Sequence, residues 1–249
     1  MPNHRPIQAI SCCITGTAFS VEYVDKLYRS LKRNTSKPFT FFVICDGQNY
    51  VKLLNNKEYH CIVPSQTLPG WWIKTALWGR EWIDGLTAAG YTHNLYFDLD
   101  TVITSNIDDL FYRPEPFSVL RNFLQPPVRN PNVYPAKFGS AVMSFNYAPS
   151  VVFPDMKNKF LLDKQDVMQK YDRTGDQVFF EDELERLSFP VTYLQDIFPE
   201  NANYFRSVKY PTTIDSLNKL PWNTHVLCYH GDRRMHLELD TDLVKNFWC

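Results

Sequence analysis

The chain has 249 residues, of which 44% are hydrophobic and 15% aromatic, so it can bury a core and is not a disordered chain. Its net charge of -1 provides no basic field for nucleic acid, and no apolar run approaches the roughly 20 residues that span a bilayer. The six cysteines form no Cys-x-x-Cys pair, and several lie in apolar runs, as reduced thiols do. We therefore expect a cytoplasmic protein without a signal peptide or a transmembrane segment.

The first third of the chain alternates strands and helices. Ile7–Ile14, Phe39–Cys45 and Tyr59–Val63 are predicted strands, and Ser20–Lys32 carries apolar residues at helical spacing. This order predicts parallel βαβ units, and hence an α/β fold with a mostly parallel central sheet flanked by helices. No internal repeat or change of composition divides the chain, so we expect a single domain over residues 1–249.

Polar residues follow these strands at the end where open parallel sheets bind ligands. Thr15 and Gly16 follow the first strand, and Asp46 follows the second. Gly16 would let a ligand approach the backbone closely, although an ordinary turn glycine explains it equally well. Lys74 lies near the start of a helix predicted to reach Asp84, where the helix dipole disfavours a cation. It therefore either serves an anion such as a phosphate or is a solvated surface lysine.

The sharpest signal is the run His93–Ile103, in which an apolar strand ends at Asp98 and Asp100. Residues i and i+2 of a strand point to the same face, so the two carboxylates repel each other unless a cation lies between them. Hard oxygen ligands of this kind suit Mg²⁺ or Mn²⁺. The alternative is a pair of turn aspartates, one capping locally and the other solvated.

Two further strands, Phe117–Leu120 and Phe138–Asn146, flank a proline-rich loop over Arg121–Lys137. Loops of this length without their own structure are often functional. The small residues Gly139 and Ser140 would leave room for a ligand beside the second strand. Close packing of the backbone is the alternative explanation for them.

A charged segment, Phe160–Tyr171, is predicted to be one helix, and Gly175 opens another that reaches Leu187. Asp176 lies at or near the N-cap of the second helix. The simplest interpretation of Asp176 is that it caps this helix, which contributes about 1 kcal/mol.

The last predicted strand, Val226–Tyr229, ends at His230, and Gly231, Arg233 and Arg234 follow it. One imidazole together with the two carboxylates would make a three-ligand metal site. Arginines beside such a site could neutralise a diphosphate. The alternative is a structural histidine at the end of a strand.

These motifs together resemble a known family. Tyr96-Phe97-Asp98-Leu99-Asp100 resembles the DxD motif of GT-A glycosyltransferases, especially those related to glycosyltransferase family 8. The resemblance covers most of the chain in the family's order. Its other motifs are Thr15-Gly16, Ile73-Lys74-Thr75-Ala76-Leu77, Phe138-Gly139-Ser140-Ala141-Val142, Gly175-Asp176-Gln177 and Cys228-Tyr229-His230-Gly231.

The resemblance implies transfer of a sugar from a nucleoside diphosphate, a UDP-sugar, to a glycan or other hydroxyl acceptor, with retention of anomeric configuration. It implies a Mn²⁺ or Mg²⁺ ion held by Asp98, Asp100 and His230. Asp176 and Gln177 would be the catalytic pair, which stabilises the oxocarbenium-like state of the sugar. The residues implied in donor binding are Thr15, Gly16, Asp46, Lys74, Asp98, Gly139, Ser140, Gly231, Arg233 and Arg234.

Two alternatives remain open. The segment from Asp98 to Val102 also matches the nucleophile loop of haloacid-dehalogenase-type phosphatases, in which the first aspartate is phosphorylated. In those enzymes the nucleophile normally follows the first strand, whereas several strands precede Asp98. The other alternative is a non-catalytic relative that binds carbohydrate through its aromatic residues.

Overall fold

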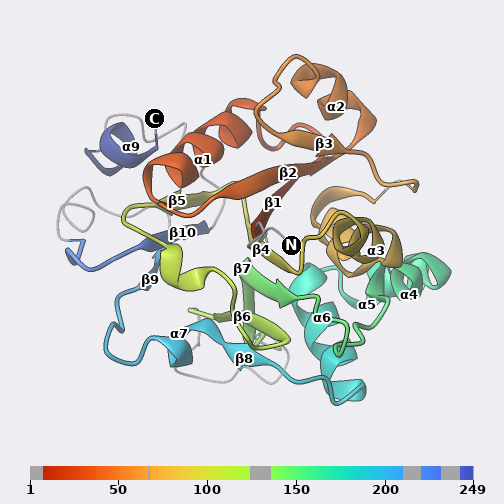
Figure 1. Cartoon of the computed structure of the whole chain (residues 1–249). Coiled ribbons are helices and arrows are strands. Elements are labelled where there is room, and N and C mark those ends of the chain that lie inside the picture. The colour runs from red at the N-terminus through yellow and green to blue at the C-terminus, as the bar shows by residue number, and fades with distance from the viewer. Residues whose placement is uncertain (1–7, 67, 124–135, 210–219, 231–241, 249) are drawn as a thin grey trace, which may run out of the picture.

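The computed structural model describes residues 8–66, 68–123, 136–209, 220–230 and 242–248 (Figure 1). Most of the predicted loop between Arg121 and Lys137, and the segment that follows His230, lie outside the described residues. In the described part of the chain, no helix is both long enough and apolar enough to cross a membrane.

Strands and helices alternate along the chain, and two short 3-10 helices, η1 and η2, interrupt them. The elements are β1 (Gln8–Ile14), α1 (Glu22–Arg33), β2 (Phe39–Cys45), α2 (Gly47–Leu53), β3 (His60–Ile62), η1 (Gly70–Trp78), α3 (Arg80–Ala88), β4 (His93–Phe97), β5 (Thr101–Ile103), η2 (Asp108–Leu110), β6 (Phe117–Arg121), β7 (Phe138–Asn146), α4 (Met156–Leu162), α5 (Lys164–Lys170), α6 (Gly175–Arg186), β8 (Thr192–Tyr193), α7 (Leu194–Ile197), β9 (Phe205–Lys209), β10 (Val226–His230) and α9 (Asp242–Phe247).

The central sheet has seven strands in the order β3-β2-β1-β4-β7-β6-β8. The four strands β3, β2, β1 and β4 are parallel to one another, and β7 runs antiparallel to both β4 and β6. A smaller sheet, β5-β10-β9, lies beside it. The predicted α/β fold with a mostly parallel sheet is therefore confirmed.

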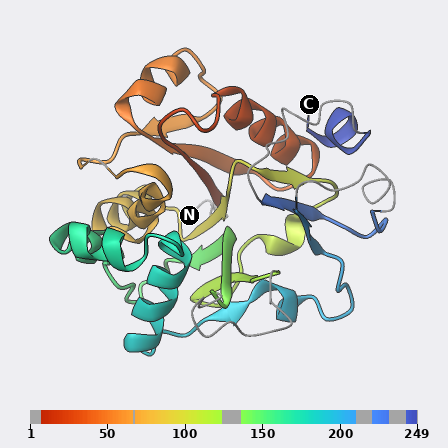
Figure 2. The ribbon, with the colours of Figure 1, turned by 180° about the vertical axis from the view of Figure 1, so that it is seen from behind.

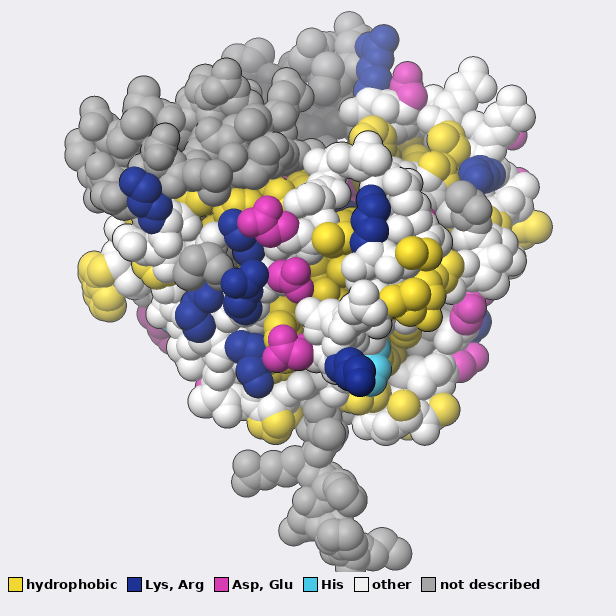
Figure 3. All heavy atoms as spheres, turned by 90° about the horizontal axis from the view of Figure 1, so that it is seen from above, with side chains coloured by type: hydrophobic (Ala, Val, Ile, Leu, Met, Phe, Trp, Pro, Cys, Tyr) yellow, Lys and Arg dark blue, Asp and Glu magenta, His cyan; other side chains and the backbone are white. Residues whose placement is uncertain are grey.

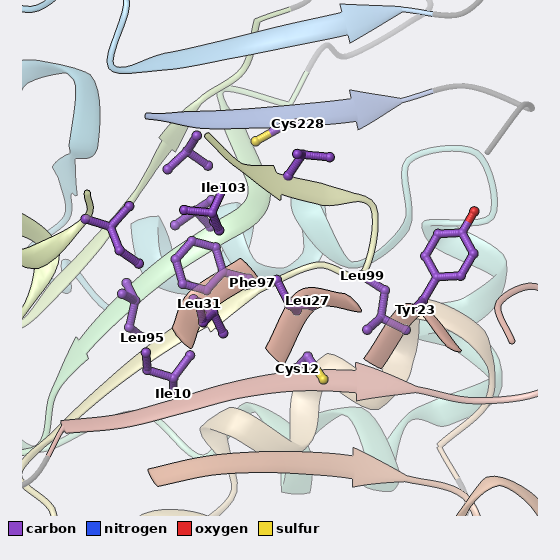
Figure 4. Packing of buried hydrophobic residues seen from close by; sticks show 14 of the residues in the cluster. Ile10, Cys12, Tyr23, Leu27, Leu31, Leu95, Phe97, Leu99, Ile103 and Cys228 are labelled. Carbon is purple, nitrogen blue, oxygen red and sulfur yellow. The ribbon is translucent and has the colours of Figure 1, made fainter. Parts of the chain in front are cut away.

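One face of the central sheet packs against α1 and the smaller sheet. Every residue of β1 is buried, so both faces of the sheet are covered at this strand. Tyr23, Leu27 and Leu31 of α1 belong to the same buried cluster as residues of β1 and β4, and the ring of Tyr23 points away from β1 (Figure 4). Their spacing is that of one helix face, which is why the sequence pattern identified this helix.

The opposite face is covered by η1, α3 and the helices α4 to α6 (Figure 2). Trp78 is fully buried there, and its ring lies 4.7 Å from Phe117 and 5.1 Å from Phe145, measured between ring centroids. Seen from above, the molecule shows Lys and Arg side chains interspersed with Asp and Glu side chains (Figure 3). The described residues on that face therefore carry both signs of charge.

The prediction of one continuous helix reaching Asp84 was wrong. Lys74 lies in the middle of η1, and α3 begins only after Gly79, whose backbone is extended. The buried side chain of Lys157 packs against the backbone at this break. A Cβ atom at Gly79 would lie 2.6 Å from Cδ of Lys157, so a larger residue would displace the lysine. The prediction of one helix over Phe160–Tyr171 was also wrong, because α4 and α5 are separate helices.

Phe97, the last residue of β4, is fully buried in the cluster that β1, β4 and α1 form. We expect Phe97→Ala to lower the free energy of unfolding by about 3–5 kcal/mol, because it removes transfer energy and leaves a cavity. Urea unfolding measures this change. Val152→Ala is the matched control, since Val152 is 74% exposed, and we expect it to change stability by less than about 0.5 kcal/mol. Equal effects of the two variants would contradict this description of the core.

Candidate active site

A buried lysine joins two carboxylates at the edge of the central sheet. Nζ of Lys74 lies 2.8 Å from Oδ1 and 2.9 Å from Oδ2 of Asp98, and 3.5 Å from Oδ2 of Asp176. It also donates a hydrogen bond of 3.0 Å to Oγ of Ser140, which in turn donates one of 3.0 Å to Oδ2 of Asp176. Four side chains from η1, the end of β4, β7 and α6 thus form one hydrogen-bonded network.

The network is almost closed to solvent. Lys74 is 8% exposed, Asp176 is 5% and Ser140 is 1%. The structure therefore excludes the solvated surface lysine that the sequence left open. Asp176 is also not the N-cap of α6, because Thr174 occupies that position and the Asp176 carboxylate contacts Ser140 and Lys74 instead.

Burial and charge act in opposite directions on the ionisation of these groups. Burial lowers the pKa of Lys74, but the charges of Asp176 and Asp98 outweigh it, so the pKa is raised and the ammonium form is kept. Burial raises the pKa of Asp176 above its ordinary value, and Lys74 and the hydrogen bond from Ser140 oppose this change. The lysine is therefore the cation that makes a buried carboxylate tolerable at this position.

The two aspartates of the DxD sequence lie in the turn between β4 and β5, and not within a strand. The backbone N–H of Asp98 donates to the carbonyl of Ala141 at 2.8 Å, and that of Thr101 donates to the carbonyl of Asp98 at 3.1 Å. The expectation that both carboxylates lie on one strand face was therefore wrong in its geometry. The hydroxyl of Tyr96 donates to Oδ1 of Asp98 and holds this side chain against Lys74.

Asp100 lies beside the last strand of the smaller sheet. Its carbonyl accepts a 3.0 Å hydrogen bond from the backbone N–H of Tyr229, and the residue is 9% exposed. The next residue, His230, ends β10. Its side chain lies outside the described part of the structure, as do Gly231, Arg233 and Arg234.

The described residues include two of the three predicted metal ligands, Asp98 and Asp100. Asp98 holds Lys74 and Tyr96, yet a carboxylate has about four lone-pair sites and keeps capacity for a further partner. Asp98 and Asp100 supply the hard oxygen ligands that Mn²⁺ and Mg²⁺ prefer. Among the described residues, no three His, Cys, Asp or Glu side chains are grouped to hold a metal, so the third ligand remains a prediction.

A second cluster lies at the ends of β1 and β2. Oδ2 of Asp46 accepts hydrogen bonds from Oγ1 of Thr15 at 3.1 Å and from the backbone N–H of Gly16 at 2.6 Å. Oδ1 accepts one of 2.8 Å from the backbone N–H of Asn49. Burial raises the pKa of Asp46, but these hydrogen bonds outweigh it and lower the pKa. Asp46 therefore stays ionised and fixes the loop in which Gly16 adopts a φ of 62°.

Both clusters lie at the carboxyl edge of the parallel strands. Ile14 pairs with Cys45, and Ser11 pairs with Tyr96, in the parallel register of β1 with β2 and β4. The residues that follow these strands therefore meet at one edge, as the sequence predicted. Of the remaining predicted residues, Gln177 follows Asp176 on α6 and is partly exposed. Gly139 faces Leu120, where its Cβ would lie 3.4 Å from Cβ of that residue.

Sequence reasoning missed three residues that shape the site. The sequence assigned no role to Tyr96, although it precedes Asp98 by two residues. That spacing places both side chains on the same side of an extended chain, where they can contact each other. Asn49 also donates from Nδ2 to the carbonyl of Gly16 at 3.0 Å, and no sequence pattern indicated it. Gly175 has a φ of 65°, and a Cβ there would lie 3.0 Å from Nε1 of Trp71, so only glycine fits before Asp176.

Solved structures of glycosyltransferases match the fold of this chain over most of its length. The galactosyltransferase LgtC, solved in complex with donor and acceptor sugar analogues, matches with a TM-score of 0.56 and 15% identity, over 97% of this chain and 96% of its own. The glycosyltransferase GlyE of Streptococcus pneumoniae TIGR4 matches with a TM-score of 0.53 and 14% identity, over 93% of this chain and 56% of its own.

The chain therefore spans little more than half the length of GlyE. A scan against protein-family models finds no match, and a search of curated proteins also finds none. At these identities the likeness concerns the fold alone. The chain has the GT-A-type fold of these glycosyltransferases.

The network leads to a prediction about stability and pH. We expect Lys74→Met to lower the free energy of unfolding at pH 7 by about 3–5 kcal/mol, because the buried carboxylate of Asp176 and the partly buried one of Asp98 lose their cation. The pKa of Asp176 is already raised in the folded protein, and loss of Lys74 raises it further. The folded state then binds a proton more readily than the unfolded state, so the deficit shrinks as the pH falls.

Urea unfolding at pH 7 and pH 5 measures this dependence. Lys170→Met is the control, because Lys170 forms an exposed ion pair with Asp182 and we expect a change of at most about 1 kcal/mol. A deficit of Lys74→Met that is the same at both pH values would show that packing, and not charge, dominates at this position.

Proposed function

We propose that the protein is a metal-dependent glycosyltransferase that moves a sugar from a nucleoside diphosphate, a UDP-sugar, to a glycan or other hydroxyl acceptor, with retention of configuration. The observation that carries the proposal is the network of Lys74, Asp98, Ser140 and Asp176 at the carboxyl edge of a GT-A-type sheet. The likeness to LgtC, which was solved with donor and acceptor sugar analogues, supports the choice of substrates.

In this proposal, Asp98, Asp100 and His230 hold Mn²⁺ or Mg²⁺. When bound, the metal would stabilise charge on the diphosphate as a Lewis acid. Lys74 contributes positive charge beside the same position and keeps Asp98 in place. Because the ammonium is buried, its interactions are stronger than they would be in water. Arg233 and Arg234 belong to the proposal as further cations.

Asp176 is the proposed catalytic carboxylate, together with Gln177. Positive charge develops on the sugar during transfer, and a fixed carboxylate nearby stabilises it. Ser140 and Lys74 fix the Asp176 side chain before substrate arrives. This preorganisation means that little reorientation is needed during the reaction. Gly139 and Ser140 border the space proposed for the donor sugar.

Thr15 and Gly16 are proposed to contact the nucleotide. Asp46 acts through them, since both of its oxygens already accept hydrogen bonds within the loop. A phosphatase with Asp98 as nucleophile receives less support. In those enzymes the nucleophile normally follows the first strand, whereas β1, β2 and β3 precede Asp98 in this chain.

The proposal extends to the setting of the protein. We propose one glycosyltransferase domain over residues 1–249 and a cytoplasmic location. Five cysteines of the described residues are free, which supports a reducing environment.

The function is tested with a panel of nucleotide sugars. We expect the protein with Mn²⁺ to release UDP from one UDP-sugar, slowly without acceptor and faster with a hydroxyl acceptor, and EDTA to abolish the release. A coupled assay for UDP measures the rate, and thermal shift with each nucleotide sugar gives an independent measure of binding. Full activity in EDTA would contradict the metal, and covalent labelling of Asp98 by a phosphoryl donor would favour the phosphatase.

Asp176→Asn separates chemistry from binding. Asparagine keeps a similar shape and can still accept from Ser140, but it lacks the charge. We expect kcat to fall by about 10²-fold while the affinity for UDP and Mn²⁺ changes little. Asp182→Asn on the same helix is the control, since Asp182 is half exposed and pairs with Lys170. Normal turnover by Asp176→Asn would limit this residue to a structural role.

Asp100→Asn should have the reverse effect. Loss of one carboxylate weakens metal binding, so we expect calorimetric titration of UDP with Mn²⁺ to show at least about tenfold weaker binding. Titration of UDP without metal serves as the reference, and it should be the same for both proteins. Unchanged binding in the presence of Mn²⁺ would remove Asp100 from the metal site.

A further inference from the structure

A second concave site lies away from the aspartates, between α3 and the β3 edge of the central sheet. Its volume is about 360 Å³, within the range of small-molecule pockets. Phe42 and Ile44 of β2 and Ile62 of β3 form one wall, and Trp82 and Leu86 of α3 form the other. Figure 1 shows α3 beside this edge of the sheet. The function proposed above makes no use of this pocket.

The walls are aromatic and held at fixed angles. The ring of Phe42 lies 5.6 Å from Trp82 and 5.4 Å from Tyr91, in both cases nearly perpendicular to it. The hydroxyl of Tyr91 donates a 2.9 Å hydrogen bond to Oγ1 of Thr40, which fixes this ring. Edge-to-face arrangements of this kind are favourable, so the walls are preformed. Preformed apolar walls suit a flat or chain-like apolar body.

A nearly buried cation lies at the wall of the pocket. Lys157 of α4 is 7% exposed, and its ammonium contacts Oε2 of Glu81 at 2.6 Å. An ammonium has three N–H donors, and Glu81 is the one acceptor found for it among the described residues. The Glu81 side chain is 55% exposed, so water solvates the anion of the pair while the cation stays in the protein.

The chain makes room for this lysine. A Cβ at Gly79 would lie 2.6 Å from Cδ and 3.2 Å from Cβ of Lys157, so the lysine stem reaches the pocket only because position 79 has no side chain. Burying a cation is costly unless it gains partners. The glycine at position 79 and the burial of Lys157 are therefore coupled, and together they bring the Lys157–Glu81 ion pair to the wall of an apolar pocket.

We propose that this pocket binds a small amphiphilic anion, with an apolar body against Phe42 and Trp82 and a carboxylate head that accepts hydrogen bonds from Lys157. The carboxylate supplies the ammonium with a second acceptor, and the aromatic walls remove the body from water. This proposal does not depend on the glycosyltransferase activity, because the pocket and the aspartate network share no residue.

Binding is measured with decanoate and decanol, which have the same apolar chain and differ in the charge of the head group. Both displace 8-anilinonaphthalene-1-sulfonate, an aromatic anion whose fluorescence reports on occupancy of the intact protein. We expect decanoate to bind at least about tenfold more tightly than decanol, because a charged hydrogen bond is worth about 1.5–3 kcal/mol. Equal affinity would overturn the assignment of an anionic head.

Gly85 provides the variant that closes the pocket without removing a contact. It lies at the rim on α3, and a Cβ there meets nothing within 4 Å. Gly85→Leu should weaken decanoate at least about tenfold by covering the mouth, while Gly85→Ala, the matched control, leaves the space open. Both changes favour the helix, so thermal unfolding should show no loss of stability. Undiminished binding of decanoate to Gly85→Leu would overturn the location.

Lys157→Met tests the head group separately. Methionine keeps most of the apolar stem beside Gly79 but cannot donate a hydrogen bond. We expect the affinity for decanoate to fall to that for decanol, while decanol itself binds as before. If the preference for decanoate persists in Lys157→Met, Lys157 does not hold the head and the proposal is wrong.

Discussion

The ammonium of Lys74, buried between the carboxylates of Asp98 and Asp176, is the interaction on which the rest of the site depends. Lys74 and Asp176 are both buried, and each would destabilise the fold without the other, since an unpaired charge away from water costs several kcal/mol. Together they require η1, the end of β4 and the start of α6 to lie at fixed positions. Ser140 of β7 completes the requirement by bonding to both Lys74 and Asp176. This end of the sheet is thus a structural junction.

The order of the strands explains why this junction lies at the carboxyl edge of the central sheet. Because β1, β2 and β4 are parallel, the segments that follow them leave the sheet at one edge. Asp46 uses this neighbourhood to fix the loop after β1, through Thr15 and the backbone N–H of Gly16. The site therefore has a rigid loop on one side and a rigid ion-paired network on the other. Side chains that are already held in place need little reorientation when a ligand binds.

The segment η1 lies between the aspartate network and the pocket beneath α3. On one side of η1, Lys74 faces the carboxylates, and on the other, Ala76 lines the pocket beneath α3. Two lysines, Lys74 and Lys157, are buried in this part of the structure, and each has carboxylate partners of a different kind. Those of Lys74 are nearly buried or partly buried, whereas Glu81 is largely in water. This contrast is why Lys74 belongs to a closed network and Lys157 retains capacity for a ligand.

The sequence by itself determined the strands β2 and β7 to the residue, the amphipathic helix α1 and the position of Asp98 at the end of a buried strand, since composition and periodicity are local properties. Only the tertiary structure decided the partners of Lys74, the hydrogen bonds of Asn49 and the break at Gly79. Each depends on a contact between residues far apart in the chain, and no pattern within a short window records such a contact.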